Sequence, residues 1–235
     1  VFFTGTACQI AGLKQFLGKD YDNLYTADVL CHGTPSPKLW KMYLEYLKKV
    51  NNSDVKSVNF RDKSIGWKKF SMRVKFDNSE LSEPFYNNKY MNLFLGNICL
   101  RPSCYDCHFK SLVRPSDITI GDYWGLSAEH KAWHNMGTSL VVTHTQKADD
   151  LVSSLGCDSD FMVCRGSKES ARNGNPKMYR SGVKADNRLK MMDNISKMGL
   201  HRGIQASRNF KDRLKLVYYR YLPEWAKRIA VRIVK

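Results

Sequence analysis

Three cysteines stand close together in the middle of this 235-residue chain, at Cys99, Cys104 and Cys107. Thiolates this closely spaced either ligate a metal or form disulfides, and a Cys-x-x-Cys loop suits a metal because both sulfurs can turn toward one point. The spacing matches that of plant-type 2Fe-2S ferredoxins, whose fourth cysteine lies elsewhere. A structural zinc bound by Cys104, Cys107 and two distant thiols, or by His108, is the competing interpretation. The residues alone leave iron–sulfur and zinc open.

Two further cysteines follow expected strands. Residues 1–4 are typical of a buried strand, and the next turn leads into a helix with apolar residues at helical spacing, so Cys8 lies near a helix N-terminus, where free amides favour the thiolate. The alternative is a small buried thiol. Residues 24–30 predict a second strand that ends at Cys31. Because ligands bind at the carboxyl ends of strands in open α/β sheets, we expect both cysteines at one such edge.

The elements that must position these cysteines alternate along the chain. Ser36 as N-cap and Pro37 at the first helical position predict a helix to about Val50. Further strands are expected over residues 55–60, 70–76, 117–120, 140–143 and 161–164, and further helices over 90–95 and 147–155. The Gly66-Trp67 pair falls in a charged loop that we expect to be an exposed turn. The pattern predicts an α/β fold, bordering on α+β, with a mixed sheet and flanking helices.

Positive charge is concentrated in the last third of the chain. Residues 1–164 carry 19 lysines and arginines against 17 acidic residues, whereas residues 165–235 carry 19 against 5, within a formal net charge of +16. We therefore expect a domain over 1–164 and a basic helical extension over 165–235, with an amphipathic helix at 210–222 and an apolar stripe continuing through Trp225, Ile229 and Ile233. This tail either packs on the domain or docks on an anionic surface or a partner subunit.

Composition also bears on the compartment. Seven cysteines, an odd number, in a chain of this size without a secretion signal indicate reduced thiols and a cytoplasmic protein. The sequence contains no run of 18 or more apolar residues, so it predicts no membrane-spanning helix. The chain opens at Val1 directly on an apolar stretch, so we expect it to be a piece of a longer polypeptide.

A resemblance bears on the choice of metal. Five blocks carry it: residues 5–13, 31–36, 59–63 with Gly66-Trp67, 100–107 and 116–125. In this order, over residues 1 to about 145, they resemble the C-terminal domain of the coenzyme F-420 hydrogenase/dehydrogenase beta-subunit family. Members of that family are iron–sulfur flavoproteins that pass electrons between clusters, FAD and a deazaflavin coenzyme or another partner.

The resemblance implies a set of cluster ligands. The cysteines inside the matching blocks, Cys8, Cys31, Cys104 and Cys107, are the implied ligands of one 4Fe-4S cluster. Cys99, Cys157 and Cys164 fall outside the blocks and are expected not to ligate, with Cys99 held in reserve. The family usually has Pro where this chain has Ala7. It often carries an upstream ferredoxin-like segment, which would be one source of electrons; a separate redox partner protein is the other.

The resemblance also implies FAD beside the cluster, with coenzyme F-420 or another redox partner beyond it. Lys110 and Arg114 are expected to meet the flavin's phosphates or to stabilise a reduced, anionic ring. Other residues are expected to line the pocket: Thr6, Asp117, Gly121, Asp122, Gly137, Thr138 and Ser139. Backbone amides at glycine-rich turns suit phosphate. The predicted function is therefore an iron–sulfur flavoprotein oxidoreductase.

Two rival functions stay open. One is a zinc-stabilised module whose basic region binds nucleic acid or another anionic surface; nucleic acid is disfavoured because the aromatic residues of the tail fall on its apolar face. The other is a non-catalytic subunit that keeps the cluster but has lost the flavin. Bacterial members of the family often occur together with polysaccharide-assembly enzymes. In that setting, the basic tail would bind the anionic inner face of the membrane.

Overall fold

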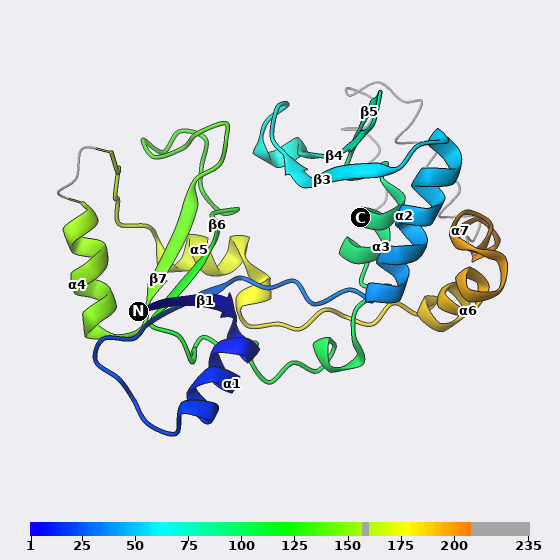
Figure 1. Cartoon of the computed structure of the whole chain (residues 1–235). Coiled ribbons are helices and arrows are strands. Elements are labelled where there is room, and N and C mark those ends of the chain that lie inside the picture. Colours follow the sequence, from blue (N-terminus) through cyan, green and yellow to red (C-terminus); the bar gives the residue numbers. More distant parts are fainter. Residues whose placement is uncertain (157–159, 208–235) are drawn as a thin grey trace, which may run out of the picture.

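The computed structural model describes residues 1–156 and 160–207 and arranges the strands among them in two sheets (Figure 1). The first sheet has the order β1 (Phe2–Thr6), β2 (Tyr25–Val29), β6 (Ile118–Asp122), β7 (Ser139–Thr143). In it β1, β2 and β6 are parallel and β7 is antiparallel. The second sheet is antiparallel and consists of β3 (Val55–Asp62), β4 (Ser71–Phe76) and β5 (Glu80–Pro84). The expected α/β class with a mixed sheet is confirmed.

Helices separate most of these strands. They are α1 (Ala7–Leu17), α2 (Pro37–Asn51), α3 (Lys89–Leu95), α4 (Gln146–Leu155), α5 (Lys168–Gly174), α6 (Arg188–Met198) and α7 (Leu200–Ser207), with short 3-10 turns at Trp67–Lys69, Pro102–Cys104 and Pro176–Met178. The predicted start of α2 is confirmed, since the Ser36 hydroxyl accepts a hydrogen bond of 3.4 Å from the Leu39 amide and Pro37 is the first helical residue.

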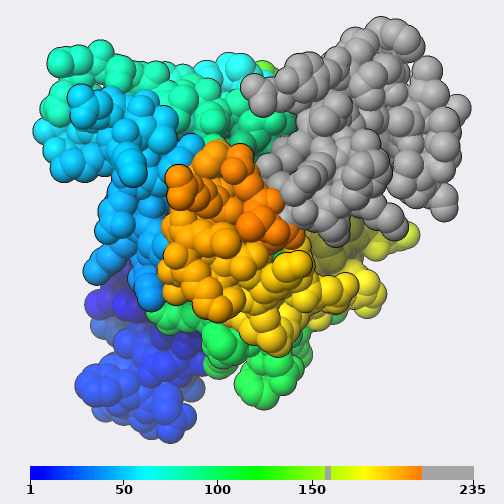
Figure 2. Space-filling view, turned by 90° about the vertical axis from the view of Figure 1, so that its right-hand side faces the viewer, coloured from blue at the N-terminus to red at the C-terminus, as the bar shows by residue number. Residues whose placement is uncertain are grey.

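The larger core lies between the antiparallel sheet and its helices. Tyr43 of α2 and Met72 of β4 are almost fully buried there, and Ile195 of α6 and Ile204 of α7 belong to the same cluster. Figure 2 shows α6 and α7, in orange, packed against α2, in light blue. The described part of the predicted extension thus contributes to the core of the preceding domain, and a boundary at 164 stays a prediction.

The four-stranded sheet, which we call the parallel sheet after its three parallel strands, is covered on both faces by other parts of the chain, as parallel strands require. Ala148 of α4 packs on Ala27 and Ile118. On the other side, Leu140 packs with Ala171 of α5, within a cluster that also contains Tyr123, Leu126 and Met178. The strand ends next to the cysteines are therefore fixed from two directions.

Several expectations about individual elements are wrong. Residues 1–4 do lie in a strand, but β1 is the edge of its sheet and Phe2 is 53% exposed. Residues 161–164 form no strand. Trp67 is 1% exposed and stacks on Trp124, so its loop is not a simple exposed turn. The strand β5 was not expected, because its sequence is polar.

Three chain segments run between the two sheets, over residues 30–36, 96–117 and 175–187 (Figure 1). The first two touch where the Arg101 amide donates to the Thr34 carbonyl at 2.9 Å. The second and third touch where the Cys107 amide donates to the Ser181 hydroxyl at 3.0 Å. Cys31, Cys104 and Cys107 lie on these segments, so the junction of the two sheets carries the cysteine site.

Some expectations fall outside the described residues. These are Cys157 and the tail, with its helix at 210–222 and its apolar residues Trp225, Ile229 and Ile233. Within residues 1–156 and 160–207, no helix has both the length and the apolar character needed to cross a membrane.

Candidate metal centre

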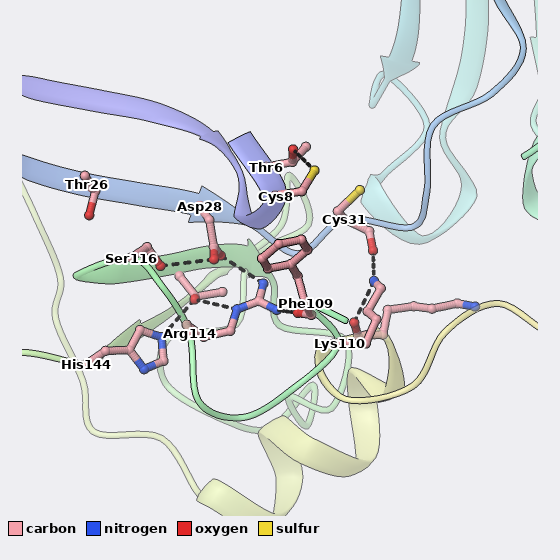
Figure 3. A network of polar contacts seen from close by, with 12 residues as sticks. Thr6, Cys8, Thr26, Asp28, Cys31, Phe109, Lys110, Arg114, Ser116 and His144 are labelled. Atoms are coloured by element: carbon pink, nitrogen blue, oxygen red, sulfur yellow. Dashed lines mark hydrogen bonds and ion pairs between the residues drawn. The ribbon is translucent and has the colours of Figure 1, made fainter. Parts of the chain in front are cut away.

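The carboxyl ends of β1 and β2 bring two of the predicted ligands to one edge of the parallel sheet. Thr6 is paired in register with Val29, and Val29 in turn with Ile120 of β6. Cys8 and Cys31 each follow two residues after this row. Figure 3 shows their sulfurs on the same side of the strand ends, with the Thr6 hydroxyl 3.0 Å from the Cys8 sulfur.

The 104–107 loop reaches this edge through a close approach at Gly33. The Thr34 amide donates a hydrogen bond to the Cys104 sulfur at 3.3 Å. Gly33 has φ +148°, and a β-carbon there would lie 2.9 Å from the Leu100 side chain and 3.4 Å from the Cys104 β-carbon. Glycine suits this position because residues with a side chain rarely adopt such a positive φ, and a side chain there would also displace the end of Leu100.

The predicted ligands influence one another electrostatically. Burial raises the pKa of the Cys31 thiol; the Lys110 ammonium and the Gly33 amide oppose this, while the thiols of Cys104 and Cys8 add to it. Burial lowers the pKa of Lys110, and the thiols of Cys31 and Cys107 oppose that shift. Each of the four predicted ligands is therefore close enough to act on Cys31 or on Lys110.

The donor set can be compared with what each kind of metal requires. Within the described residues, no group of three or more histidine, cysteine or acidic side chains stands ready to hold a metal ion. A 4Fe-4S cubane distributes four thiolates over four irons, so its ligands surround a volume and do not converge on one ion. Four soft sulfur donors, an amide donating to Cys104 and a nearby ammonium fit such a cluster. The ligand set itself stays a prediction.

The remaining described cysteines lie elsewhere. Cys99 is 1% exposed in the larger core, where burial raises the pKa of its thiol to about 11. Cys164 is half-buried. The placement of Cys99 in an apolar core accords with the expectation that it does not ligate.

Arg114 lies under the parallel sheet and is engaged by internal partners (Figure 3). Its guanidinium donates to Asp28 at 2.9 Å, to the Phe109 carbonyl at 2.8 Å and to the Thr119 hydroxyl at 3.3 Å. Ser116 donates to the other carboxylate oxygen of Asp28 at 3.0 Å. Sequence reasoning missed Asp28, although an aspartate inside the apolar strand β2 was a signal, because a buried carboxylate needs a partner.

Asp117 is engaged in the same way. Its carboxylate accepts hydrogen bonds from the Thr26 amide at 2.8 Å, the Thr26 hydroxyl at 2.7 Å and the Thr145 hydroxyl at 3.0 Å. Burial by itself would raise the pKa of Asp117, but these hydrogen bonds and Lys147 outweigh it and leave the pKa below its usual value. Asp117 therefore joins β2, β6 and the start of α4.

Five of the residues predicted to line a flavin pocket do come together, at the ends of β6 and β7. Asp122 is paired in register with Ser139, and Gly121, Gly137 and Thr138 are their neighbours. Asp122 also forms an ion pair of 2.7 Å with Arg61. Thr6 lies instead beside the Cys8 sulfur, and the Lys110 ammonium contacts the Cys31 carbonyl.

Internal partners therefore occupy three charged side chains that were predicted to meet a flavin: Arg114, Asp117 and Asp122. Each of these three would have to exchange an internal partner for a flavin, and their contact with FAD stays a prediction. Contact between FAD and the other predicted residues stays a prediction.

A family model matches most of the chain. The model of the family described as coenzyme F420 hydrogenase/dehydrogenase, C terminus of the beta subunit, matches residues 1–161. The matched range contains all four predicted ligand cysteines and extends beyond residue 145, where the resemblance of the motif blocks ends. A search among curated proteins found no match.

Proposed function

Because this chain belongs to the coenzyme F-420 hydrogenase/dehydrogenase beta-subunit family, an oxidoreductase subunit family, we propose that it carries electrons through a 4Fe-4S cluster. The ligands of the cluster are Cys8, Cys31, Cys104 and Cys107. FAD is the next carrier, and coenzyme F-420 or another redox partner lies beyond it.

The observation that supports the proposal is the convergence of cysteines from three distant parts of the chain. The amide of Thr34, three residues after Cys31, donates to the sulfur of Cys104, and the thiols of Cys104 and Cys8, 73 and 23 positions from Cys31 in the sequence, add to the raised pKa of Cys31. Lys110 links Cys31 to Cys107. Two of the thiols follow strand ends and two lie in one loop. This is expected for a cluster that is held by the whole fold and not by one short sequence motif.

The chain's own residues hold and tune such a site. The Thr34 amide donates to the Cys104 sulfur, and the Thr6 hydroxyl lies within hydrogen-bonding distance of the Cys8 sulfur. Hydrogen bonds to the sulfurs stabilise extra negative charge there, so they favour the reduced state. When bound, the cluster supplies one-electron chemistry and the flavin couples it to two-electron chemistry.

The test is anaerobic purification followed by an absorption spectrum and metal analysis. We expect broad visible absorbance that dithionite bleaches, with about four irons per chain. Flavin released on denaturation and measured by fluorescence then separates an iron–sulfur flavoprotein from a non-catalytic, cluster-bearing subunit. A colourless protein that holds one zinc and takes up no iron on reconstitution would overturn the proposal.

The partner and the location belong to the same proposal. We propose a redox partner protein, or an upstream ferredoxin-like segment, as the second electron carrier, in the cytoplasm. Contact of the basic tail with an anionic inner membrane surface is proposed from its charge alone. Vesicle co-sedimentation that is lost in high salt would support that contact, since salt screens it.

A further inference from the structure

Lys110 is a cation held against the backbone of the cysteine segments. The Lys110 amide donates to the Cys107 carbonyl at 3.1 Å, and this turn directs the side chain back over the loop. Its ammonium donates to the carbonyl of Cys31 and, at 2.8 Å, to the carbonyl of Lys177 (Figure 3). Lys110 therefore joins all three segments that cross between the two sheets.

The charges around Lys110 are unusual for a half-buried lysine. Within residues 1–156 and 160–207 it forms no ion pair with a carboxylate, whereas the buried Arg114 does. Cys31 and Cys107 favour its charge, while Lys177 and Arg114 oppose it. Removing a cation from water is costly unless an anion lies nearby. The ammonium contacts the carbonyl oxygens of Cys31 and Lys177, which carry no net charge, so the thiols of Cys31 and Cys107 are the groups that could provide the anion.

We propose, resting on the proposed function, that Lys110 is the charge-compensating and positioning residue of the cluster. Its ammonium offsets the negative charge that four thiolates bring to the site, and it thereby raises the cluster's reduction potential. This role differs from the flavin contact that the sequence suggested, because the ammonium is directed at the cysteine segments.

The test compares Lys110→Met with Lys110→Arg in the cluster-loaded protein. Methionine keeps much of the length of the side chain and removes its charge, whereas arginine keeps the charge. The midpoint potential is measured by anaerobic dithionite titration, in which each cluster accepts one electron. We expect K110M to disfavour reduction at least tenfold, which is 59 mV to more negative potential for one electron. K110R should stay near wild type.

A matched control removes a lysine charge elsewhere. Lys41 is exposed to solvent on α2, so Lys41→Met changes the net charge equally but should leave the potential unchanged, because water and salt screen its charge. If K110M loses its iron while K110R retains it, the charge is needed even to hold the cluster, and the inference is supported.

Other outcomes would overturn the inference. A K110M protein with the potential of the K41M control would show that the ammonium does not act on the cluster. Loss of iron from both K110M and K110R would make Lys110 a packing residue. A wild-type protein that binds no iron would instead refute the proposed function, and the two failures are distinguished by the iron content of the wild type.

Discussion

The carboxylate of Asp28, in the middle of β2, pairs at 2.9 Å with the guanidinium of Arg114, which lies 86 residues further along the chain. The two side chains are 0% and 4% exposed. This ion pair fixes the loop that follows Cys107 under the parallel sheet. The Asp28–Arg114 contact thereby links the centre of β2 to the loop that carries the predicted ligand Cys107.

Removal of this pair should destabilise the fold. Arg114→Met would leave Asp28 buried without a counter-ion, and we expect a loss of about 3–5 kcal/mol in the free energy of unfolding, measured in urea. The surface pair Lys197–Asp193, with side chains 70% and 55% exposed, provides the control: Lys197→Met should cost no more than about 0.5 kcal/mol. Equal midpoints for the two variants would show that the Asp28–Arg114 pair is not structural.

Substitution of single cysteines should separate ligands from packing residues. Serine at Cys8, Cys31, Cys104 or Cys107 should lower the iron content after anaerobic reconstitution, because a hydroxyl is a poor substitute for a soft thiolate. Cys99→Ala should keep the iron and lose only stability, since Cys99 is buried in the larger core. If instead C99A lost the iron and C8S kept it, the ligand assignment would have to be revised.

Two glycines should respond to alanine in opposite ways. A β-carbon at Gly121 would lie 2.5 Å from the Leu30 side chain, next to Cys31, so Gly121→Ala should cost about 1–3 kcal/mol and lower iron retention. Gly12 of α1 has nothing within 4 Å of that position, so Gly12→Ala should add about 0.5–1 kcal/mol through helix propensity. Thermal unfolding of both variants checks the pair, and a stabilised G121A would contradict the close contact.

His144 should contribute to acid sensitivity. Burial lowers the pKa of this histidine, whose Nε2 lies 2.8 Å from the Thr119 hydroxyl. The unfolded chain then binds a proton more readily than the folded one, so stability falls as the pH drops below about 6.5, the ordinary histidine value. His144→Gln should flatten the stability profile below about pH 6.5. An unchanged profile would mean that other groups cause the loss.

Much of the local structure could be predicted from the sequence. The Ser36-Pro37 start of α2, the strands that deliver Cys8 and Cys31 and the alternating pattern of β4 are all present in the fold. These features depend on residues within a few positions of one another, and periodicity or capping chemistry reports them directly. Polar β5 and exposed β1 were not predicted correctly, because burial in a strand depends on its neighbours in the sheet.

The sequence by itself determined the local features, namely the strands that precede Cys8 and Cys31 and the helix start at Ser36-Pro37, because neighbouring residues carry those signals. Only the tertiary structure decided which partner each polar side chain has. It paired Arg114 with Asp28, placed the Lys110 ammonium on the carbonyls of Cys31 and Lys177, and buried Trp67 against Trp124. The physical reason is that a charge or an aromatic ring needs a partner, but the sequence pattern does not state which distant segment supplies it.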